Sequence, residues 1–132
     1  MAHPNEELVR TGYEAFLGGD FAALNELFAD DIEWHAPGRS QVSGDFRGKD
    51  EVFTQFAKVF ELTGGTFQLQ IHDVLGNDEH VVVLARATGQ IGDRSLDDNS
   101  VQVFHITDGK VTEQWLHPGD VYASDEFWGQ AE

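Results

Sequence analysis

Residues 49–72 read KDEVFTQFAKVFELTGGTFQLQIH, and the spacing of the apolar residues changes within this stretch. From about residue 49 to 62 the apolar residues recur every three or four positions, which places on one helix face Val52, Phe53, Phe56, Val59 and Phe60. After the Gly64-Gly65 pair the period becomes two, because Phe67, Leu69 and Ile71 alternate with polar residues. The stretch therefore predicts a helix that ends at two glycines and a half-buried strand that follows it.

The chain before this stretch is also mainly helical in pattern. Apolar residues at helical spacing predict helices near 5–18 and 20–29, with Asp20 as the N-cap of the second helix. Residues 32–38, IEWHAPG, are typical of a short strand that Pro37-Gly38 ends. We expect a polar loop between this strand and the third helix.

The chain after residue 72 is typical of strands joined by tight turns. Strands are predicted near 81–89, 100–107 and 111–116, and Asp108-Gly109 is a strong signal for a two-residue hairpin. The tail 121–129 has no clear pattern, although Phe127 and Trp128 indicate that it packs on the remainder of the chain. The fold class expected is α+β, with three N-terminal helices packed on a curved antiparallel sheet that encloses a pocket.

Composition excludes several classes of partner and site. The chain has 132 residues, with 24 Asp plus Glu against 8 Lys plus Arg and a formal net charge of -16, so it repels nucleic acid and anionic membranes. With no cysteine it has neither disulfides nor thiolate ligands for zinc. No apolar run reaches the length of a membrane span and no signal peptide is visible. We expect one cytoplasmic domain over residues 1–132.

Three segments together resemble a known family. They are GYEAFLGGDFAALNELFADDIEWHAPG (12–38), SGDFRGKDEVFTQF (43–56) and VFHITDGKVTEQW (103–115), followed by an Asp. In this order they resemble SnoaL-like proteins, named for polyketide cyclases, within the nuclear-transport-factor-two-like superfamily. The resemblance implies a cone-shaped fold with a cavity, frequent dimerisation and no need for a metal or organic cofactor. The superfamily includes isomerases, cyclases, hydrolases and binding modules, so function has to be argued from the site.

The same resemblance implies a catalytic pair. SnoaL-like cyclases place a His on the strand before the DGK hairpin and an Asp beyond the Trp of the return strand, and these positions match His105 and Asp120. The segment between Trp115 and Asp120 is one residue longer than in the family pattern. A carboxylate in an apolar pocket has a raised pKa and serves as an acid–base, while an imidazole stabilises an enolate. The alternative for Asp120 is an ordinary turn residue or helix N-cap after Pro-Gly, and for His105 a hydrogen-bonded histidine on a half-buried strand.

Other polar and aromatic residues are candidates for the pocket wall. Because neighbouring residues on a strand face opposite sides, only one of Trp34 and His35 lines the pocket. Arg86 is a charge on an apolar strand and either pairs with an acidic neighbour or binds an anionic ligand. The full candidate set is Tyr13, Trp34, His35, Arg86, Trp115 and His117. No HxH or HExxH pattern is present, and we expect no metal.

Two functions remain open from the sequence. The first is a cofactor-independent cyclase, isomerase or lyase acting on a small hydrophobic carbonyl compound, with Asp120 as acid–base and His105 beside it. The second is a non-catalytic module that binds a small hydrophobic molecule or another protein. A ketosteroid-isomerase-like enzyme is disfavoured, because the family's Asp before the first strand's proline is Ala36 here. Apolar residues on both faces of the strands predict a homodimer through the sheet.

Overall fold

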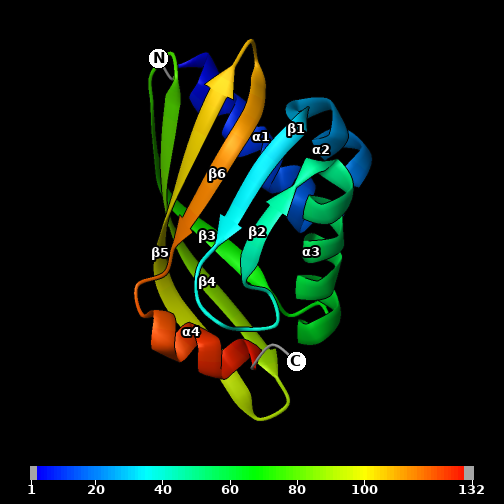
Figure 1. Cartoon of the computed structure of the whole chain (residues 1–132). Coiled ribbons are helices and arrows are strands. Elements are labelled where there is room, and N and C mark those ends of the chain that lie inside the picture. Colours follow the sequence, from blue (N-terminus) through cyan, green and yellow to red (C-terminus); the bar gives the residue numbers. More distant parts are fainter. Residues whose placement is uncertain (1–2, 130–132) are drawn as a thin grey trace.

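The computed structural model describes residues 3–129 and has the expected α+β architecture (Figure 1). In chain order the elements are α1 (Pro4–Leu17), α2 (Phe21–Leu27), β1 (Phe28–Ala36), β2 (Gly44–Arg47), α3 (Gly48–Thr63), β3 (Gln68–Gly76), β4 (His80–Ile91), β5 (Arg94–Thr107), β6 (Lys110–His117) and α4 (Val121–Trp128). The three N-terminal helices are confirmed. A fourth helix, α4, forms in the tail, where no clear pattern predicted one.

The helix ends follow local chemistry. His3 caps α1 through a reciprocal capping box with Glu6, and Asp20 caps α2 by accepting from the Ala23 amide at 3.0 Å. Helix α3 ends at Gly64, whose φ of 60° is in the left-handed region. Helix α2 is shorter than predicted, because Phe28 already belongs to β1 and pairs with Val111 of β6.

The six strands form one sheet in the order β2-β1-β6-β5-β4-β3. Four of the neighbouring pairs are antiparallel, in agreement with the expected antiparallel sheet, while β1 and β6 run parallel. The predicted loop before α3 contains the short strand β2, which pairs with β1 from Glu33↔Arg47 to Ala36↔Gly44. The predicted hairpin at residues 108–109 is confirmed, and both of its turn residues have positive φ.

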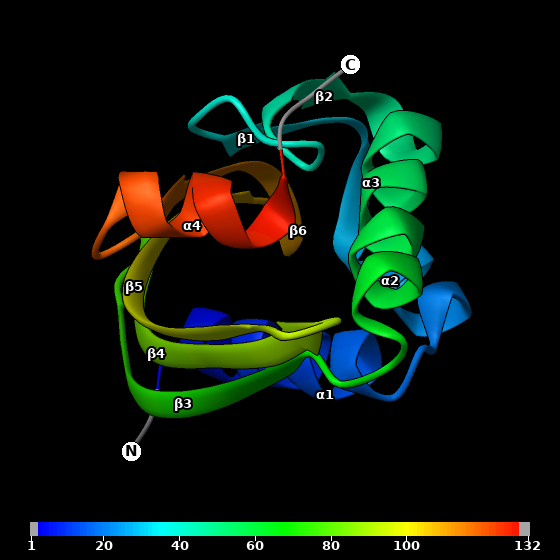
Figure 2. The same ribbon diagram turned by 90° about the horizontal axis from the view of Figure 1, so that it is seen from below.

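The sheet is strongly curved and its concave face is covered by helices (Figure 2). Helix α1 packs on β3 and β4, α3 packs on β1 and β2, and α4 lies at one end of the sheet against β5. One core cluster fills the space between α1, α3 and the sheet, and a second, smaller cluster lies beneath α4 and includes Phe127 and Trp128. Within residues 3–129, none of the helices has the length and apolar character needed to cross a bilayer.

Candidate functional site

A cavity of about 130 Å³ lies between the concave face of the sheet and helices α1, α3 and α4. Its wall is mainly apolar and aromatic, with rings contributed by Phe16, Phe28, Trp34, Phe56, Phe104 and Trp128. The rings pack edge to face, as in Trp34 against Phe56 with centroids 4.9 Å apart and planes at 80°. This arrangement gives an aromatic-lined pocket of the kind that receives small organic ligands.

Three neutral polar side chains lie together in this wall. Gln102 on β5 and Gln114 on β6 occupy inward positions of neighbouring strands, and Tyr13 reaches them from α1. The Tyr13 hydroxyl donates to Gln102 Oε1, and Gln114 Nε2 donates to the same oxygen at 3.5 Å. Burial raises the pKa of Tyr13 well above its ordinary value, so the phenol stays protonated at neutral pH.

The wall contains few groups that could take part in acid–base chemistry. Among its described residues there is no Asp, Glu, His, Lys or Arg, so Tyr13 is the titratable group that a ligand meets there. Ala36 lies in the wall and is 8% exposed. At this position a ketosteroid-isomerase-like enzyme carries its Asp, and a methyl group cannot transfer a proton.

The proposed acid–base residue is not in this wall. Asp120 is exposed at the N-terminus of α4, where its Oδ1 accepts hydrogen bonds from the amides of Tyr122 at 3.0 Å and Ala123 at 3.1 Å. We expected its carboxylate to lie in an apolar pocket, and the structure corrects this, because the residue is exposed. The Pro118-Gly119 turn, whose Gly119 amide donates to Asp98, brings Asp120 to the helix cap instead.

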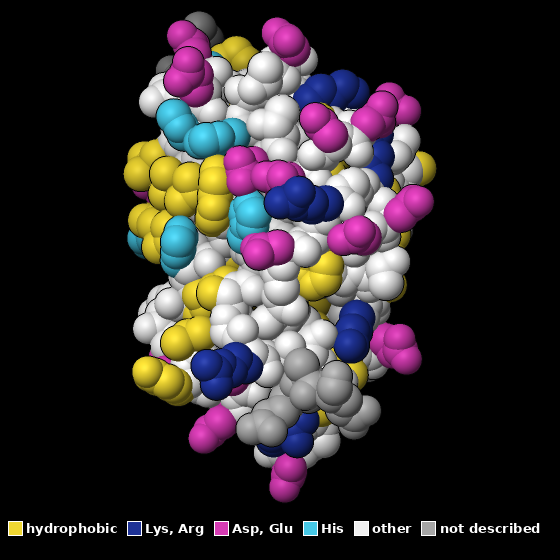
Figure 3. All heavy atoms as spheres, viewed as in Figure 1, with side chains coloured by type: hydrophobic (Ala, Val, Ile, Leu, Met, Phe, Trp, Pro, Cys, Tyr) yellow, Lys and Arg dark blue, Asp and Glu magenta, His cyan; other side chains and the backbone are white. Residues whose placement is uncertain are grey.

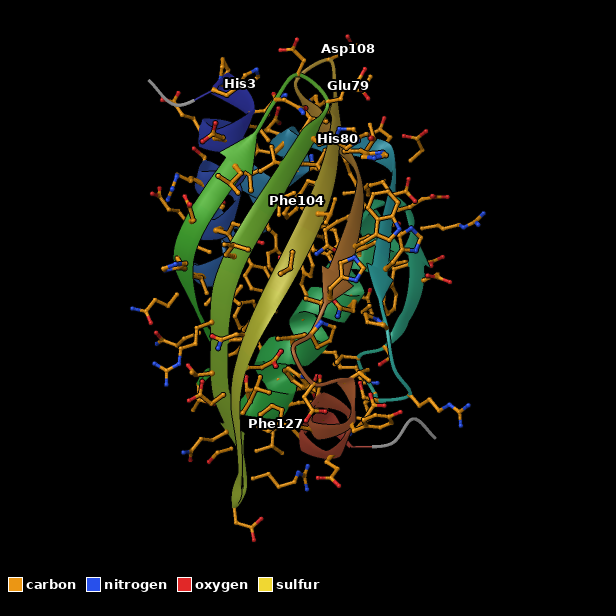
Figure 4. All side chains as sticks on the ribbon, turned by 90° about the vertical axis from the view of Figure 1, so that its left-hand side faces the viewer. His3, Glu79, His80, Phe104, Asp108 and Phe127 are labelled. Atoms are coloured by element: carbon orange, nitrogen blue, oxygen red, sulfur yellow. The ribbon has the colours of Figure 1, made fainter. Side chains whose placement is uncertain are left out.

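The candidate histidines on the sheet lie on its convex face. Strand alternation directs Gln102, Phe104 and Ile106 inward, and the half-buried His105 therefore points outward. His105 packs edge-on against Trp115 with ring centroids 4.8 Å apart, and against His80 with centroids 4.6 Å apart. Figure 4 shows His80 near the end of the sheet opposite Phe127 and α4.

The pocket candidates divide in the same way. Tyr13 and Trp34 line the cavity, whereas His35, Trp115 and His117 project from the convex face of β1 and β6. Arg86 is exposed on the convex face of β4 and pairs with Asp97 of β5 through two bonds of 2.7 and 2.6 Å. The charge of Arg86 on this strand is therefore explained by its ion pair with Asp97 rather than by an anionic ligand.

His35 is held between two carboxylates on this convex face. Its Nδ1 lies 2.6 Å from Asp45 Oδ1 and its Nε2 lies 2.7 Å from Glu113 Oε2, and its ring stacks on Trp115. Desolvation lowers the pKa of His35, but the hydrogen bonds and charges of Asp45 and Glu113 outweigh it and raise the pKa overall.

An overlapping cluster is the metal candidate among the described residues. Ligand atoms of Glu33, His35 and Glu113 lie within 4.8 Å of one another. A metal needs the neutral imidazole, whereas this arrangement favours imidazolium with both nitrogens bound to carboxylates. The imidazolium thus supplies the positive charge between the carboxylates, and the fit to a metal is poor.

Sequence reasoning missed the two glutamines that form the polar part of the cavity. Neither Gln102 nor Gln114 belongs to a catalytic motif, and a neutral amide on a strand resembles an ordinary surface residue. The signal that could have found them is the alternation along each strand, which places them on the same face as buried apolar residues. Gln102 is two residues from Phe104 on β5, so both side chains belong to the same face.

Comparison with known proteins agrees with this architecture. Residues 9–114 match the model of the SnoaL-like domain. An uncharacterised protein of Mycobacterium tuberculosis is 31% identical over 123 residues, which cover 92% of this chain and 94% of that protein. The structure of Bal32a, from a soil-derived mobile gene cassette, is 41% identical with a TM-score of 0.92, and the match covers 96% of this chain and 97% of Bal32a.

A more distant solved structure shares the fold. A nuclear-transport-factor-two-like protein from Burkholderia xenovorans superposes with a TM-score of 0.83 at 24% identity, over 96% of each chain. The domain match extends from α1 to β6 and so includes most of the elements that build the cavity. The chain belongs to the SnoaL-like domain family.

Proposed function

We propose that the protein binds a small, uncharged, largely apolar molecule in its cavity. The observation that carries this proposal is the wall itself, which is aromatic and aliphatic, contains three clustered neutral polar groups, and has no charged side chain among its described residues. An ionised ligand would lose its hydration there without gaining a counter-charge, and this cost excludes it. An apolar ring gains by leaving water, at roughly 25 cal/mol per Å² buried.

The size of the cavity limits the ligand. An engineered protein cavity of about 150 Å³ lined by Leu, Ile and Phe stays dry and binds benzene. The cavity of about 130 Å³ is therefore suited to a ligand, or the inserted end of a ligand, of about one ring. Ser124 and Trp128 of α4 belong to the wall, so α4 helps to limit the size of the part that enters the cavity.

Acid–base turnover of a carbonyl compound is the second candidate, and the buried phenol of Tyr13 favours it. A protonated phenol can donate to an oxygen on which enolate charge develops. The reaction also needs a base, and Asp120 would have to leave its cap on α4 to supply one. The Tyr13 proton is already donated to Gln102. These two observations support binding ahead of catalysis.

Binding is tested with single-ring probes and a pair of matched variants. Benzene and toluene are titrated into the wild type by ligand-detected NMR, and saturable binding is expected. Ala36→Leu adds a side chain to the wall and should weaken binding by at least about tenfold, whereas Ala57→Leu on the exposed face of α3 should leave it unchanged. Failure of the wild type to bind any ring probe would refute the proposal.

A further inference from the structure

Gln114 has a hydrogen-bonding group that the protein leaves without a partner. Its residue is 1% exposed and lies in the cavity wall. Nε2 donates to Gln102 Oε1, but no described residue donates to Gln114 Oε1. Buried side-chain acceptors in folded proteins almost always have a donor, so an acceptor without one indicates a partner from outside the chain.

The orientation of the Gln114 amide follows from its neighbours. Gln102 Oε1 already accepts from the hydroxyl of Tyr13, so it acts as an acceptor toward both side chains. Reversing the Gln114 amide would bring two carbonyl oxygens face to face 3.5 Å apart, without a proton between them. The nitrogen of Gln114 therefore faces Gln102, and its oxygen is the acceptor that has no donor.

The oxygen of Tyr13 is a second hydrogen-bond acceptor in this cluster. Its proton is directed at Gln102 Oε1, and its raised pKa keeps that proton in place at neutral pH. The phenolic oxygen can then offer a ligand only a lone pair. Two acceptors, Tyr13 Oη and Gln114 Oε1, thus lie together in one cluster of a mainly apolar wall, whose other polar side chains are those of Ser40, Ser43, Gln55 and Ser124.

We infer that the cavity selects neutral ring compounds that carry a hydrogen-bond donor, such as phenols and cyclic alcohols, over ketones of the same shape. This inference rests on the proposed binding function and specifies its ligand class. The ligand hydroxyl donates to Gln114 Oε1 while its ring lies among Trp34, Phe56 and Phe104. A ketone offers no proton, so it leaves the glutamine oxygen buried and unpaired.

The wild type alone provides the first test. Cyclohexanol and cyclohexanone differ by one hydroxyl and have nearly the same volume, and their dissociation constants are measured by calorimetry or NMR titration. We expect cyclohexanol to bind about tenfold more tightly, the ratio that one hydrogen bond of ordinary net strength gives. A ketone that binds as tightly as the alcohol, or more tightly through the amide N–H groups, overturns the inference.

A variant pair provides the second test. Gln114→Met keeps the length of the side chain and removes the acceptor, so the preference for phenol over toluene should fall by about tenfold while toluene still binds. Gln70→Met makes the same change at an exposed position of β3 and should leave the preference as in the wild type. An unchanged preference in a folded Gln114→Met protein overturns the inference.

The two proposals fail in different ways. If neither toluene nor cyclohexanone nor their hydroxylated partners bind the wild type, the proposed function itself is wrong. If the apolar probes bind but the hydroxyl gives no advantage, binding stands and the acceptor role of Gln114 is wrong. If Gln114→Met does not fold, the wild-type comparison of alcohol and ketone decides.

Discussion

At the scale of residues, the alternation of side chains along each strand decides which of them face the cavity and which face the convex surface. On β6, Gln114 and Leu116 line the cavity while Trp115 and His117 face outward. A shift of one position would exchange the two sets. The family resemblance matched His105 to a catalytic position by its place in a motif, but its direction depends on which neighbours are buried, and Phe104 beside it is 4% exposed.

Asp120 should behave as a helix cap in mutagenesis. Asp120→Ala removes the acceptor for the Tyr122 and Ala123 amides and should lower the free energy of unfolding by about 1 kcal/mol, whereas Asp120→Asn retains an acceptor and should cost much less. Urea denaturation measures both. Ligand affinity should not change in either variant. A turnover that Asp120→Asn abolishes without a loss of stability would instead favour the acid–base role.

His35 should give a pH-dependent contribution to stability. Its pKa is raised above the ordinary 6.5 in the folded chain by Asp45 and Glu113, against a desolvation that lowers it. The ion pairs therefore stabilise the fold fully below about pH 6.5, and this contribution is lost as the pH rises through the folded pKa. Glu113→Gln should lower the pKa of His35 measured by NMR, and its loss of stability relative to the wild type should shrink from pH 6 to pH 9.

The control for this titration is Glu61→Gln on the exposed surface of α3, which removes one charge that makes no hydrogen bond to His35. It should leave the pKa of His35 close to that of the wild type. If both variants shift the pKa equally, the net charge of the chain, and not the contact with Glu113, sets the value.

The sequence was informative about single residues where local chemistry decides and silent where three-dimensional contacts decide. Asp20 as a cap and Asp108-Gly109 as a hairpin turn were predicted because their neighbours lie next to them in the chain. The cluster of Tyr13, Gln102 and Gln114 joins α1 to β5 and β6, and a separation of 89 residues between Tyr13 and Gln102 leaves no local pattern.

At the scale of elements, α4 closes one end of the cavity and is held there by several backbone contacts. Asp125 accepts from the Arg39 amide at 3.0 Å, and the Gln41 amide donates to the Gly129 carbonyl at 2.9 Å. Arg94 Nε donates to the Phe127 carbonyl at 3.0 Å. The loop after β1 and the start of β5 thus fix the helix that carries Ser124 and Trp128 into the wall.

Gly38 should be the critical position for this docking. Its φ is +100°, and a Cβ there would lie 2.3 Å from Asp125 Oδ1. Gly38→Ala should therefore both strain the backbone and displace α4, with faster amide exchange over residues 121–129 and weaker ligand binding. Gly19→Ala has the positive φ of +70° but no atom within 4 Å of the new Cβ, so it reports the strain alone. Equal exchange at α4 in both variants would contradict the docking role.

The elements that the sequence did not predict depend on pairing partners. Periodicity identified α1, α3 and the strands of the long hairpins, because each buries one face. Strand β2 has four residues, too few to show a period, and exists because β1 offers it an edge. The parallel pairing of β1 with β6 joins strands that are far apart in the chain, and alternation alone gives no direction for such a pair.

At the scale of the whole molecule, the helices within residues 3–129 lie on the concave side and leave the convex face of the sheet open (Figure 2). Its outer apolar patch consists of the half-buried Val82, Leu84, Val101, Val103 and Trp115. Figure 3 shows hydrophobic side chains over β5 and β6 beside histidines, with acidic residues spread over much of the remaining surface in this view. Phe104 faces the cavity and does not belong to this patch.

We predict that two copies associate through the outer apolar patch. Burial of this surface favours a dimer, while a formal net charge of -16 on each chain opposes it, so the association should strengthen with salt that screens the repulsion. Light scattering at micromolar concentration in about 0.15 M salt, where the Debye length is about 8 Å, should give the mass of a dimer.

Val103→Glu places a charge within the patch and should give a monomer, whereas Ala57→Glu adds the same charge on the exposed face of α3 and should remain dimeric. A wild type that is monomeric under these conditions, or an Ala57→Glu variant that dissociates as readily as Val103→Glu, would show that the patch does not join two copies.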